Sequence, residues 1–383
     1  MSSDDCVSTI LLCGSWRTRA GLSTDAEPRL TIPSVVERVN NSHLAVPALE
    51  RPPRAELRRV MSHGSVESWI ALEAMWQYCL GQVAGGDRGL RSVVASMPSG
   101  VSLSHMQKAE QIMFECFELD RLCLQFGGTL AAAGAAPQRW QSDWRSVTML
   151  VVDCGHESVR AVPIVDGVEQ RTKVGCLQAG GCDITDAMMR ALALRGHSFC
   201  TTADRALVEP IKHQVAYVAV DPAHERQGTN CSATCEVRTS THSCDDIGSV
   251  TLEHERFECC ECLFGANDAA GSMGSQSLTD LIRKTISSVQ PNERTLADLY
   301  GNVVLVGGTA NLPGLAARLQ RELELQAPPN IEVQCRGIEQ PHLAEWRGSL
   351  MSAADATNMF WTSKESYDEA GATGSIWYPR RQF

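Results

Sequence analysis

Hydrophobic and polar residues follow one another along this chain with two different periods, one of which predicts helices and the other strands. Apolar residues return at helical spacing in four stretches, residues 65–82, 107–124, 277–288 and 315–325. Short apolar, β-branched runs that end in small residues predict buried strands at 92–95, 148–152 and 302–306. Strands and helices that alternate in this way indicate a fold made of α/β layers.

Two segments about 140 residues apart share one plan of strand, small-residue turn and second strand. The first, ILLCGSWRTRAGL at residues 10–22, runs from an apolar strand through Cys13-Gly14-Ser15 into a basic second strand. The second, MLVVDCGHESVRAVPI at residues 149–164, repeats this order. Backbone N–H groups in such turns form concavities that hold phosphate. The pair therefore predicts an internally duplicated fold with two phosphate-facing turns.

A third segment, VVLVGGTANLPG at residues 303–314, predicts a phosphate-binding turn of a different kind. Its strand leads through Gly307-Gly308-Thr309, and a helix is predicted to begin after Pro313. Glycine permits close approach of the backbone to a ligand, and the amino-terminal end of a helix favours anions. The three segments together are more specific than any of them alone.

Length and charge narrow the class of protein. The 383 residues are enough for two or more domains with a sizeable core. A net charge of −11 argues against a general nucleic-acid-binding protein, because such proteins present a basic surface. No apolar run approaches the length of a membrane span, and the first residues, MSSDDCVS, lack the pattern of a signal peptide. We therefore expect a cytoplasmic protein with no direct nucleic-acid partner and no membrane partner.

The sixteen cysteines are expected to be reduced thiols rather than a disulfide framework. One group of them carries zinc-ligand chemistry together with two histidines. It consists of Cys231, Cys235, Cys244, Cys259, Cys260 and Cys262, with His242 and His254 between them. Because the spacing lacks a pair of CxxC knuckles, we predict no metal site and no bound zinc.

Residues 33–60 contain four prolines and predict loop and turn rather than a packed element. A small basic patch in this stretch, made of Arg51, Arg54, Arg58 and Arg59, is interpreted as a solvated loop.

Several segments resemble, in order, segments of actin. They are QIMFECF at 111–117, AVPIVDG at 161–167, residues 183–221, ERFECCECLF at 255–264, residues 298–323 and FWTSKESYDEAG at 360–371. The chain is identified as a member of the actin family, with a resemblance over nearly its whole length that is weakest at 34–60, 224–250 and 266–290.

The resemblance implies the actin fold, in which two pseudo-duplicated α/β domains surround a nucleotide cleft and each domain has two subdomains. Subdomain 1 would comprise residues 1–33, 60–132 and 345–383, and a shortened subdomain 2 would comprise residues 34–59. Subdomain 3 would comprise residues 133–179 and 268–344, and subdomain 4 residues 180–267.

The resemblance also implies a nucleotide site. The residues that match its binding pattern are Gly14, Ser15, Arg19, Asp153, Gly155, Gly181, Lys212, Gly307, Gly308 and Thr309. Arg19 replaces a phosphate-binding lysine and keeps the positive charge. Gln125 and Asp153 are remnants of the catalytic machinery, and no catalytic residue is assigned beyond them.

The departures from the family pattern fall in the phosphate loops. Leu12 stands where actin has an aspartate on the metal-water shell, and Trp16 replaces a glycine. His156-Glu157 replaces an Asp-Gly pair, which puts a carboxylate where phosphate charge should lie. Three further departures are Arg160 for an active-site histidine, His213 for a glutamate near the ribose and Leu312 for an aromatic residue near the base.

These departures predict a protein whose ATP hydrolysis is absent or negligible, because hydrolysis needs a positioned water and a metal that neutralises developing charge. Whether ATP or ADP is bound with Mg²⁺ stays open, since Lys212, Arg19 and the Gly307-Gly308-Thr309 turn remain.

The leading hypothesis is a structural subunit of a cytoskeletal or motor-associated assembly, either dynactin-like or associated with axonemal dynein. Its partners would be other protein subunits, including actin or actin-related proteins. Two alternatives stay open: a slow ATPase that polymerises like actin, and a nuclear actin-related subunit of a chromatin-remodelling complex.

The two ends of the molecule differ in how closely they resemble actin. In actin, the region matched by 34–60 carries a tip loop that inserts into the next subunit, and here it is shorter and proline-rich. The block at 360–371, from the opposite end, is well preserved. A head-to-tail filament needs two complementary ends, so we expect no long homopolymers.

Overall fold

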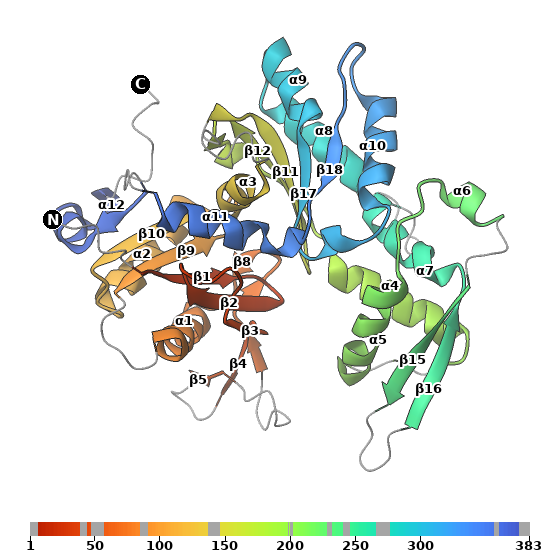
Figure 1. The fold of residues 1–383 in the computed structure, drawn as a ribbon, viewed down its shortest axis with the longest axis horizontal. Helices are drawn as coiled ribbons and strands as arrows, with labels where there is room; N and C mark the ends of the chain where they lie inside the picture. Colours follow the sequence, from red (N-terminus) through yellow and green to blue (C-terminus); the bar gives the residue numbers. More distant parts are fainter. Residues whose placement is uncertain are drawn as a thin grey trace. The chain divides into compact units, whose positions relative to one another are not determined.

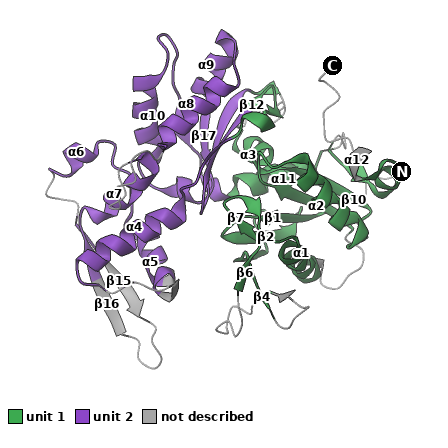
Figure 2. Ribbon diagram, turned by 180° about the vertical axis from the view of Figure 1, so that it is seen from behind, with its two compact units in different colours: residues 1–147, 164–174, 343–383 green, residues 148–163, 175–342 purple. Residues whose placement is uncertain are grey.

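The computed structural model divides into two compact units (Figure 2). Unit 1 comprises residues 1–147, 164–174 and 343–383, and unit 2 comprises residues 148–163 and 175–342. The residues that the structure describes are 7–38, 44–46, 57–84, 91–136, 146–197, 199, 202–227, 232–239, 246–265, 276–355 and 360–374. The division into four subdomains at the bounds given above stays a prediction.

Unit 1 is built on a six-stranded sheet with the order β19-β10-β9-β1-β2-β3 (Figure 1). The strands are β1 (Thr9–Cys13), β2 (Arg17–Leu22), β3 (Leu30–Pro33), β9 (Ser92–Met97), β10 (Arg121–Phe126) and β19 (Thr362–Ser363). β1 pairs antiparallel with β2 and parallel with β9, and β9 pairs parallel with β10. The first predicted strand-turn-strand segment is therefore a hairpin at the centre of this sheet.

The helices of unit 1 are α1 (Trp69–Ala84), α2 (Leu103–Glu115), α3 (Gly127–Ala135), α11 (Ala344–Ala353) and α12 (Lys364–Gly374). α3 and α11 pack at very short range, because a Cβ on Gly134 would lie 1.9 Å from the carbonyl oxygen of Ala344. A Cβ on Gly348 would likewise lie 1.8 Å from the carbonyl oxygen of Leu130. Glycine is therefore required on both helices at this crossing.

The prediction of loop and turn for residues 33–60 is wrong for the residues of this stretch that the structure describes. β4 (Val35–Arg38), β5 (Leu44–Ala45) and β6 (Leu57–Arg59) form a three-stranded sheet, followed by the β7–β8 hairpin (Met61–Ser62, Ser65–Val66). Val36 and Val60 are fully buried in the core of unit 1. Arg58 and Arg59 lie on or beside β6, while Arg51 and Arg54 fall outside the described residues. Of the four prolines only Pro33 is among the described residues, and it ends β3.

The sheet of unit 2 runs in the order β12-β11-β17-β18, with β14 also paired to β12. Its strands are β11 (Met149–Cys154), β12 (Val159–Val165), β14 (Gly175–Leu177), β17 (Val303–Val306) and β18 (Cys335–Gly337). The last residues of β12 belong to unit 1, where they pair with β13 (Val168–Glu169). A separate hairpin consists of β15 (Ala233–Thr239) and β16 (Asp246–Leu252).

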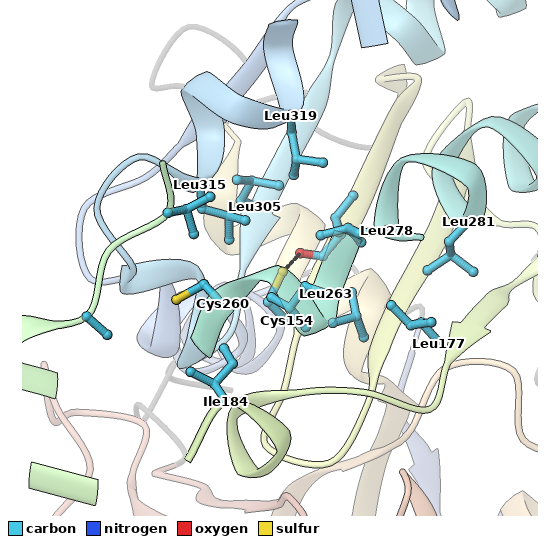
Figure 3. Close-up of a cluster of buried hydrophobic side chains, with 14 of the residues drawn as sticks. Cys154, Leu177, Ile184, Cys260, Leu263, Leu278, Leu281, Leu305, Leu315 and Leu319 are labelled. Carbon is cyan, nitrogen blue, oxygen red and sulfur yellow. Dashed lines mark hydrogen bonds between the residues drawn. The ribbon is translucent and has the colours of Figure 1, made fainter. Parts of the chain in front are cut away.

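The helices of unit 2 are α4 (Gly181–Leu194), α5 (Thr202–Val215), α6 (Pro222–Glu225), α7 (Glu255–Glu258), α8 (Leu278–Ser288), α9 (Glu293–Gly301) and α10 (Leu315–Gln326). Their apolar faces meet the sheet in one core, part of which is drawn in Figure 3. Within it the Cys154 thiol donates to the carbonyl of Val152 at the end of β11, 3.8 Å away. No described helix is long and apolar enough to cross a membrane.

The two units repeat one topology. In unit 1, β9, α2 and β10 form a parallel strand-helix-strand unit beside β1; in unit 2, β17, α10 and β18 do the same beside β11. The hairpin strands β2 and β12 lie on the other side of β1 and β11. The predicted α/β fold with an internal duplication is confirmed.

One predicted helix is wrong over half its length. The stretch 107–124 is helical to Glu115 and then becomes β10 from Arg121. Glu118 has a φ of 52°, in the left-handed region that ends a right-handed helix. Residues 121–126 pair in parallel with β9, so their apolar residues enter a sheet rather than a helix face. The helices at 277–288 and 315–325 and the strands beginning near 92, 148 and 302 are confirmed.

Candidate functional site

In unit 2, the ends of two neighbouring strands meet the first turn of a helix. The turn after β11 is closed by the Gly155 N–H, which donates to the carbonyl of Ser158 (3.0 Å). The first amides of α4 then donate to this turn, Gly181 to the Gly155 carbonyl (3.1 Å) and Cys182 to the His156 carbonyl (2.7 Å). These α4 amides, which at a helix start would favour an anion, therefore already have protein acceptors.

The turn after β17 completes this arrangement. Gly307 has a φ of 87°, and a Cβ there would lie 2.5 Å from the Cys154 carbonyl and 2.6 Å from Oδ1 of Asp153. The Thr309 hydroxyl donates to the Gly155 carbonyl (2.8 Å). The structure thus brings Asp153, Gly155, Gly181, Gly307 and Thr309 together, and their role in binding a nucleotide stays a prediction. We call these residues, with His156, Glu157 and Lys212, the unit 2 site.

Lys212 reaches the unit 2 site from α5, but its ammonium group is directed into the protein. Nζ donates to the Gly181 carbonyl and to the Thr185 hydroxyl, each at 2.9 Å. It also lies 3.6 Å from a carboxylate oxygen of Glu209, one turn earlier on α5. The side chains of Lys212 and Glu209 are only 5% and 10% exposed. Lys212 is therefore a structural cross-link between α4 and α5.

Glu209 is shared between two basic groups. Besides Lys212, it faces Nε2 of His213 at 3.7 Å. Burial raises the pKa of the Glu209 carboxyl, but the hydrogen bond from His213 and the Lys212 charge outweigh it, so that the pKa is lowered. Burial lowers the pKa of Lys212, partly offset by Glu209. Glu209 therefore stays ionised near neutral pH, and its carboxylate faces the Lys212 ammonium group 3.6 Å away.

The residues that replace the Asp-Gly pair change the charge of the unit 2 site. Burial lowers the pKa of His156 to about 4, so its imidazole is neutral at pH 7. Glu157 is 4% exposed, and its charge acts on both His156 and Cys182. The His156 ring thus lies among charges of both signs, Glu157 and Glu209 on one hand and Lys212 and Arg205 on the other.

In unit 1, the hairpin between β1 and β2 has the same backbone turn. The Gly14 N–H donates to the carbonyl of Arg17 (3.1 Å), and Trp16, 39% exposed, accepts from the Ser34 amide through its carbonyl (3.0 Å). Leu12 is 2% exposed and packs in an apolar cluster with Ile10, Val94 and Trp346. Ser15 and Arg19 are half-buried in the same hairpin.

Gln125, at the end of β10, is also in unit 1. The side chain is 5% exposed, and its Nε2 donates to the Ser352 hydroxyl (2.9 Å) and to the Cys123 sulfur (3.1 Å). Its Oε1 is buried and has no hydrogen-bond partner among the described residues. The amide end is therefore anchored to α11, while the carbonyl end keeps an unused acceptor.

Within the described parts of the chain, no group of three or more His, Cys, Asp or Glu side chains could hold a metal ion. Cys259 and Cys260 are buried thiols with sulfurs 3.9 Å apart, and Cys262 donates to the Cys259 carbonyl. Cys231, His242 and Cys244 lie outside the described residues, as does the Cys235 side chain. The absence of zinc therefore stays a prediction.

The sequence alone did not identify Glu209 and Thr185, whose side chains contact the Lys212 ammonium group. A signal existed for Glu209, because a glutamate three residues before a lysine lies on the same side of a helix. Thr185 offered no such signal. Its contact with Lys212 depends on how α4 and α5 pack against each other.

A family model described as Actin matches residues 3–378 of the chain. The chain therefore belongs to the actin family. Proteins of this family typically bind ATP or ADP with Mg²⁺, commonly interact with other proteins, and are generally cytoskeletal or nuclear.

The groups that would hold a nucleotide at the unit 2 site are already used by the protein. The Gly181 and Cys182 amides donate to the 155–158 turn, and the Lys212 ammonium group donates to the Gly181 carbonyl and the Thr185 hydroxyl. The residues of the unit 2 site therefore do not fit the nucleotide that the family typically binds.

Proposed function

We propose that this actin-family chain is a largely non-catalytic structural subunit of a cytoskeletal or motor-associated assembly, of the dynactin-like or axonemal dynein-associated kind. The observation that carries the proposal is the buried position of Leu12. Its side chain, 2% exposed, is a component of the apolar core, so β1 ends without the carboxylate that the family pattern uses near the metal.

The replaced groups act on different parts of the reaction. Phosphoryl transfer depends on metal ions and positioned charges that neutralise the transition state. Removing one electrostatic group of this kind costs on the order of a hundredfold in rate. Leu12 removes a carboxylate, and Lys212 has its charge matched by Glu209. We therefore expect no useful ATPase activity.

The carboxy-terminal block supports a docking role. Tyr367 on α12 stacks on Phe114 of α2, with ring centroids 4.6 Å apart, and its hydroxyl donates to Glu115 (2.9 Å). Lys364 pairs with Asp368 on the same helix (2.6 Å). This anchored helix belongs to the block at 360–371, which resembles the family well, and we propose it as part of the face that binds partner subunits.

A second candidate function is a slow ATPase that polymerises. The retained Gln125 favours it, because the buried Oε1 is an acceptor that no described residue uses. Against it stand Leu12 and the paired Lys212. Cytoplasmic, cytoskeletal location follows from the leading proposal, and a nuclear location would accompany the chromatin-complex alternative.

Sedimentation and negative-stain imaging of the purified chain test the proposal. The chain is incubated with ATP, Mg²⁺ and salt under conditions that polymerise actin, and phosphate release is followed in the same samples. We expect the protein to stay in the supernatant and to release no phosphate above the buffer control. Long single-component filaments would contradict the structural-subunit proposal. Phosphate turnover that a Gln125→Ala change abolishes would favour the ATPase.

A further inference from the structure

We infer that the outer side of α1 is a docking surface for a second copy of this chain, and that two copies pair there with their α1 helices antiparallel. The surface is made by Ile70, Ala74, Gln77, Tyr78 and Gly81, and we call it the α1 face. These residues recur at helical spacing, so they lie on one side of α1. The pairing is independent of which assembly the chain enters.

The composition of α1 is unusual for a helix at a protein surface. Its sequence, WIALEAMWQYCLGQVA, contains one charged residue, Glu73. Its inner side is buried through Met75 and Trp76, whereas on its outer side Ile70 is 69% exposed and Tyr78 is 37% exposed. A surface helix normally carries charged and polar residues on its outer side, and a helix that is apolar all round is normally covered all round. The outer side of α1 thus has the composition of a covered surface.

Gly81 is a second, independent indication of a neighbouring helix. It lies inside α1, where glycine is less favourable than almost any other residue. Its own chain gives no packing reason for it, because a Cβ at Gly81 would have no atom of the described residues within 4 Å. A positive φ does not explain it either. Gly81 therefore leaves a hollow on the α1 face, and such a hollow allows another chain to approach closely.

The α1 face is complementary to itself when two copies run antiparallel. In the register that is centred on Trp76, Tyr78 of one copy lies opposite Ala74 of the other. Ile70 then lies beside Gly81 of the second copy, where the hollow accepts its side chain. Large side chains thus face small ones, as in well-packed helix pairs. Two-fold symmetry makes each of these contacts twice.

Charge does not prevent this contact, although a net charge of −11 makes two copies repel each other at long range. Glu73 is the charged residue nearest to the α1 face on α1 itself. In the antiparallel register the two Glu73 residues are separated by about 9 Å along the helix axis. This separation is close to the Debye length at physiological salt, so salt screens their repulsion.

The size of α1 limits the strength of the dimer. A helix of 16 residues is about 24 Å long. One pair of such helices covers less surface than the standard protein interface of about 1,600 Å². We therefore expect a weak dimer with a Kd in the micromolar range. Because both copies use the same face, the association closes at two copies and does not propagate.

Sedimentation equilibrium of the purified full-length chain measures the association. We expect the weight-average mass to rise with concentration from 41.6 kDa towards twice that value. Two variants remove the complementarity: Gly81→Gln fills the hollow, and Ile70→Gln removes the side chain that enters it. Leu194→Gln is the matched control, because Leu194 is 91% exposed and lies on α4 in unit 2.

For Gly81→Gln and Ile70→Gln we expect a Kd at least about tenfold higher than that of the unaltered chain. For Leu194→Gln we expect an unchanged Kd. Below the Kd, Gly81→Gln should unfold at the Tm of the unaltered chain or above it, because glutamine favours a helix and the site has space for a side chain. A Gly81 needed for the fold of α1 would give a lower Tm instead.

Four results would overturn the inference. The first is a chain that stays monomeric at every concentration, which would leave the α1 face to a different protein. The second is an unchanged Kd in Gly81→Gln and Ile70→Gln, and the third is an equal loss of affinity in Leu194→Gln. The fourth is a mass that rises beyond two copies. Only this last result would also contradict the structural-subunit proposal, so the two failures are distinguishable.

Discussion

The two hairpins, β1–β2 in unit 1 and β11–β12 in unit 2, have the same turn and differ in the side chains that it carries. In each, the amide of the first turn glycine donates to the carbonyl three residues later, at 3.1 Å for Gly14 and 3.0 Å for Gly155. Unit 1 departs from the family pattern by apolar replacement, with Leu12 buried and Trp16 39% exposed. Unit 2 departs by charge, with Glu157 buried beside His156.

The two turns therefore keep one backbone hydrogen bond while their side chains differ. Strand pairing and one turn hydrogen bond suffice to keep the loop shape in both units. In unit 1 the packing of the core determines which side chains are tolerated, and in unit 2 the pairing of charges does. Substitutions in each unit test these two constraints.

The largest effect is expected for Leu12→Asp, which returns the family's carboxylate to unit 1. The new carboxylate would enter the apolar cluster around Trp346, and the half-buried Arg19, opposite Leu12 on β2, would compensate its charge only in part. We expect a loss of about 4 kcal/mol in the free energy of unfolding at pH 7, measured by urea denaturation. Leu12→Asn is the control, since it has the same shape without the charge, and it should lose less. Equal losses in both variants would show that charge is not the cause.

The next largest effect is expected for Lys212→Met, which removes the cation of unit 2 and keeps most of its volume. Glu209 would stay buried with His213 as its remaining neighbour. We expect a loss of about 3 kcal/mol. Arg226→Met provides the comparison, because the Arg226–Glu258 pair has side chains that are 50% and 44% exposed and should contribute less than about 1 kcal/mol. A loss in Lys212→Met no larger than that of the control would contradict a buried ion pair.

A pH effect is expected from His156. Its folded-state pKa of about 4 lies below the ordinary histidine value of 6.5, so the unfolded chain takes up a proton before the folded chain does. Stability should therefore fall as the pH drops from about 6.5 towards about 4, by about 2–3 kcal/mol in all. The measurement is the difference between the unaltered chain and His156→Gln across this range. A difference that does not change with pH would place His156 in contact with solvent rather than in a buried site.

The smallest effect compares the two turns themselves. A Cβ on Gly155 would lie 2.9 Å from the Ser158 carbonyl, while one on Gly14 would lie 3.3 Å from the Arg17 carbonyl. We expect Gly155→Ala to cost about 1 kcal/mol and Gly14→Ala about half of that or less. Thermal unfolding of the two variants side by side gives the measurement. The reverse order would mean that the turn of unit 1 is the less tolerant of the two.

Several errors of prediction have one cause. The stretch 107–124 is apolar at helical spacing, yet the chain leaves the helix after Glu115 and places 121–126 beside β9. Residues 33–60 are rich in proline, yet β4 pairs with β6, and Val36 and Val60 are buried. In both cases a long-range pairing decided the outcome, and a local pattern contains no information about the partner strand.

The sequence by itself determined the family, the duplicated strand-turn-strand plan and the glycines of the unit 2 site. These follow from residue type and order, because an apolar run must be buried and the positive φ of Gly307 is one that glycine adopts readily. Only the tertiary structure decided what Lys212 does. A lysine at this point of α5 can extend towards a ligand or turn into the protein. The packing of α4 against α5, which places Thr185 and the Gly181 carbonyl within 2.9 Å of Nζ, selects the second.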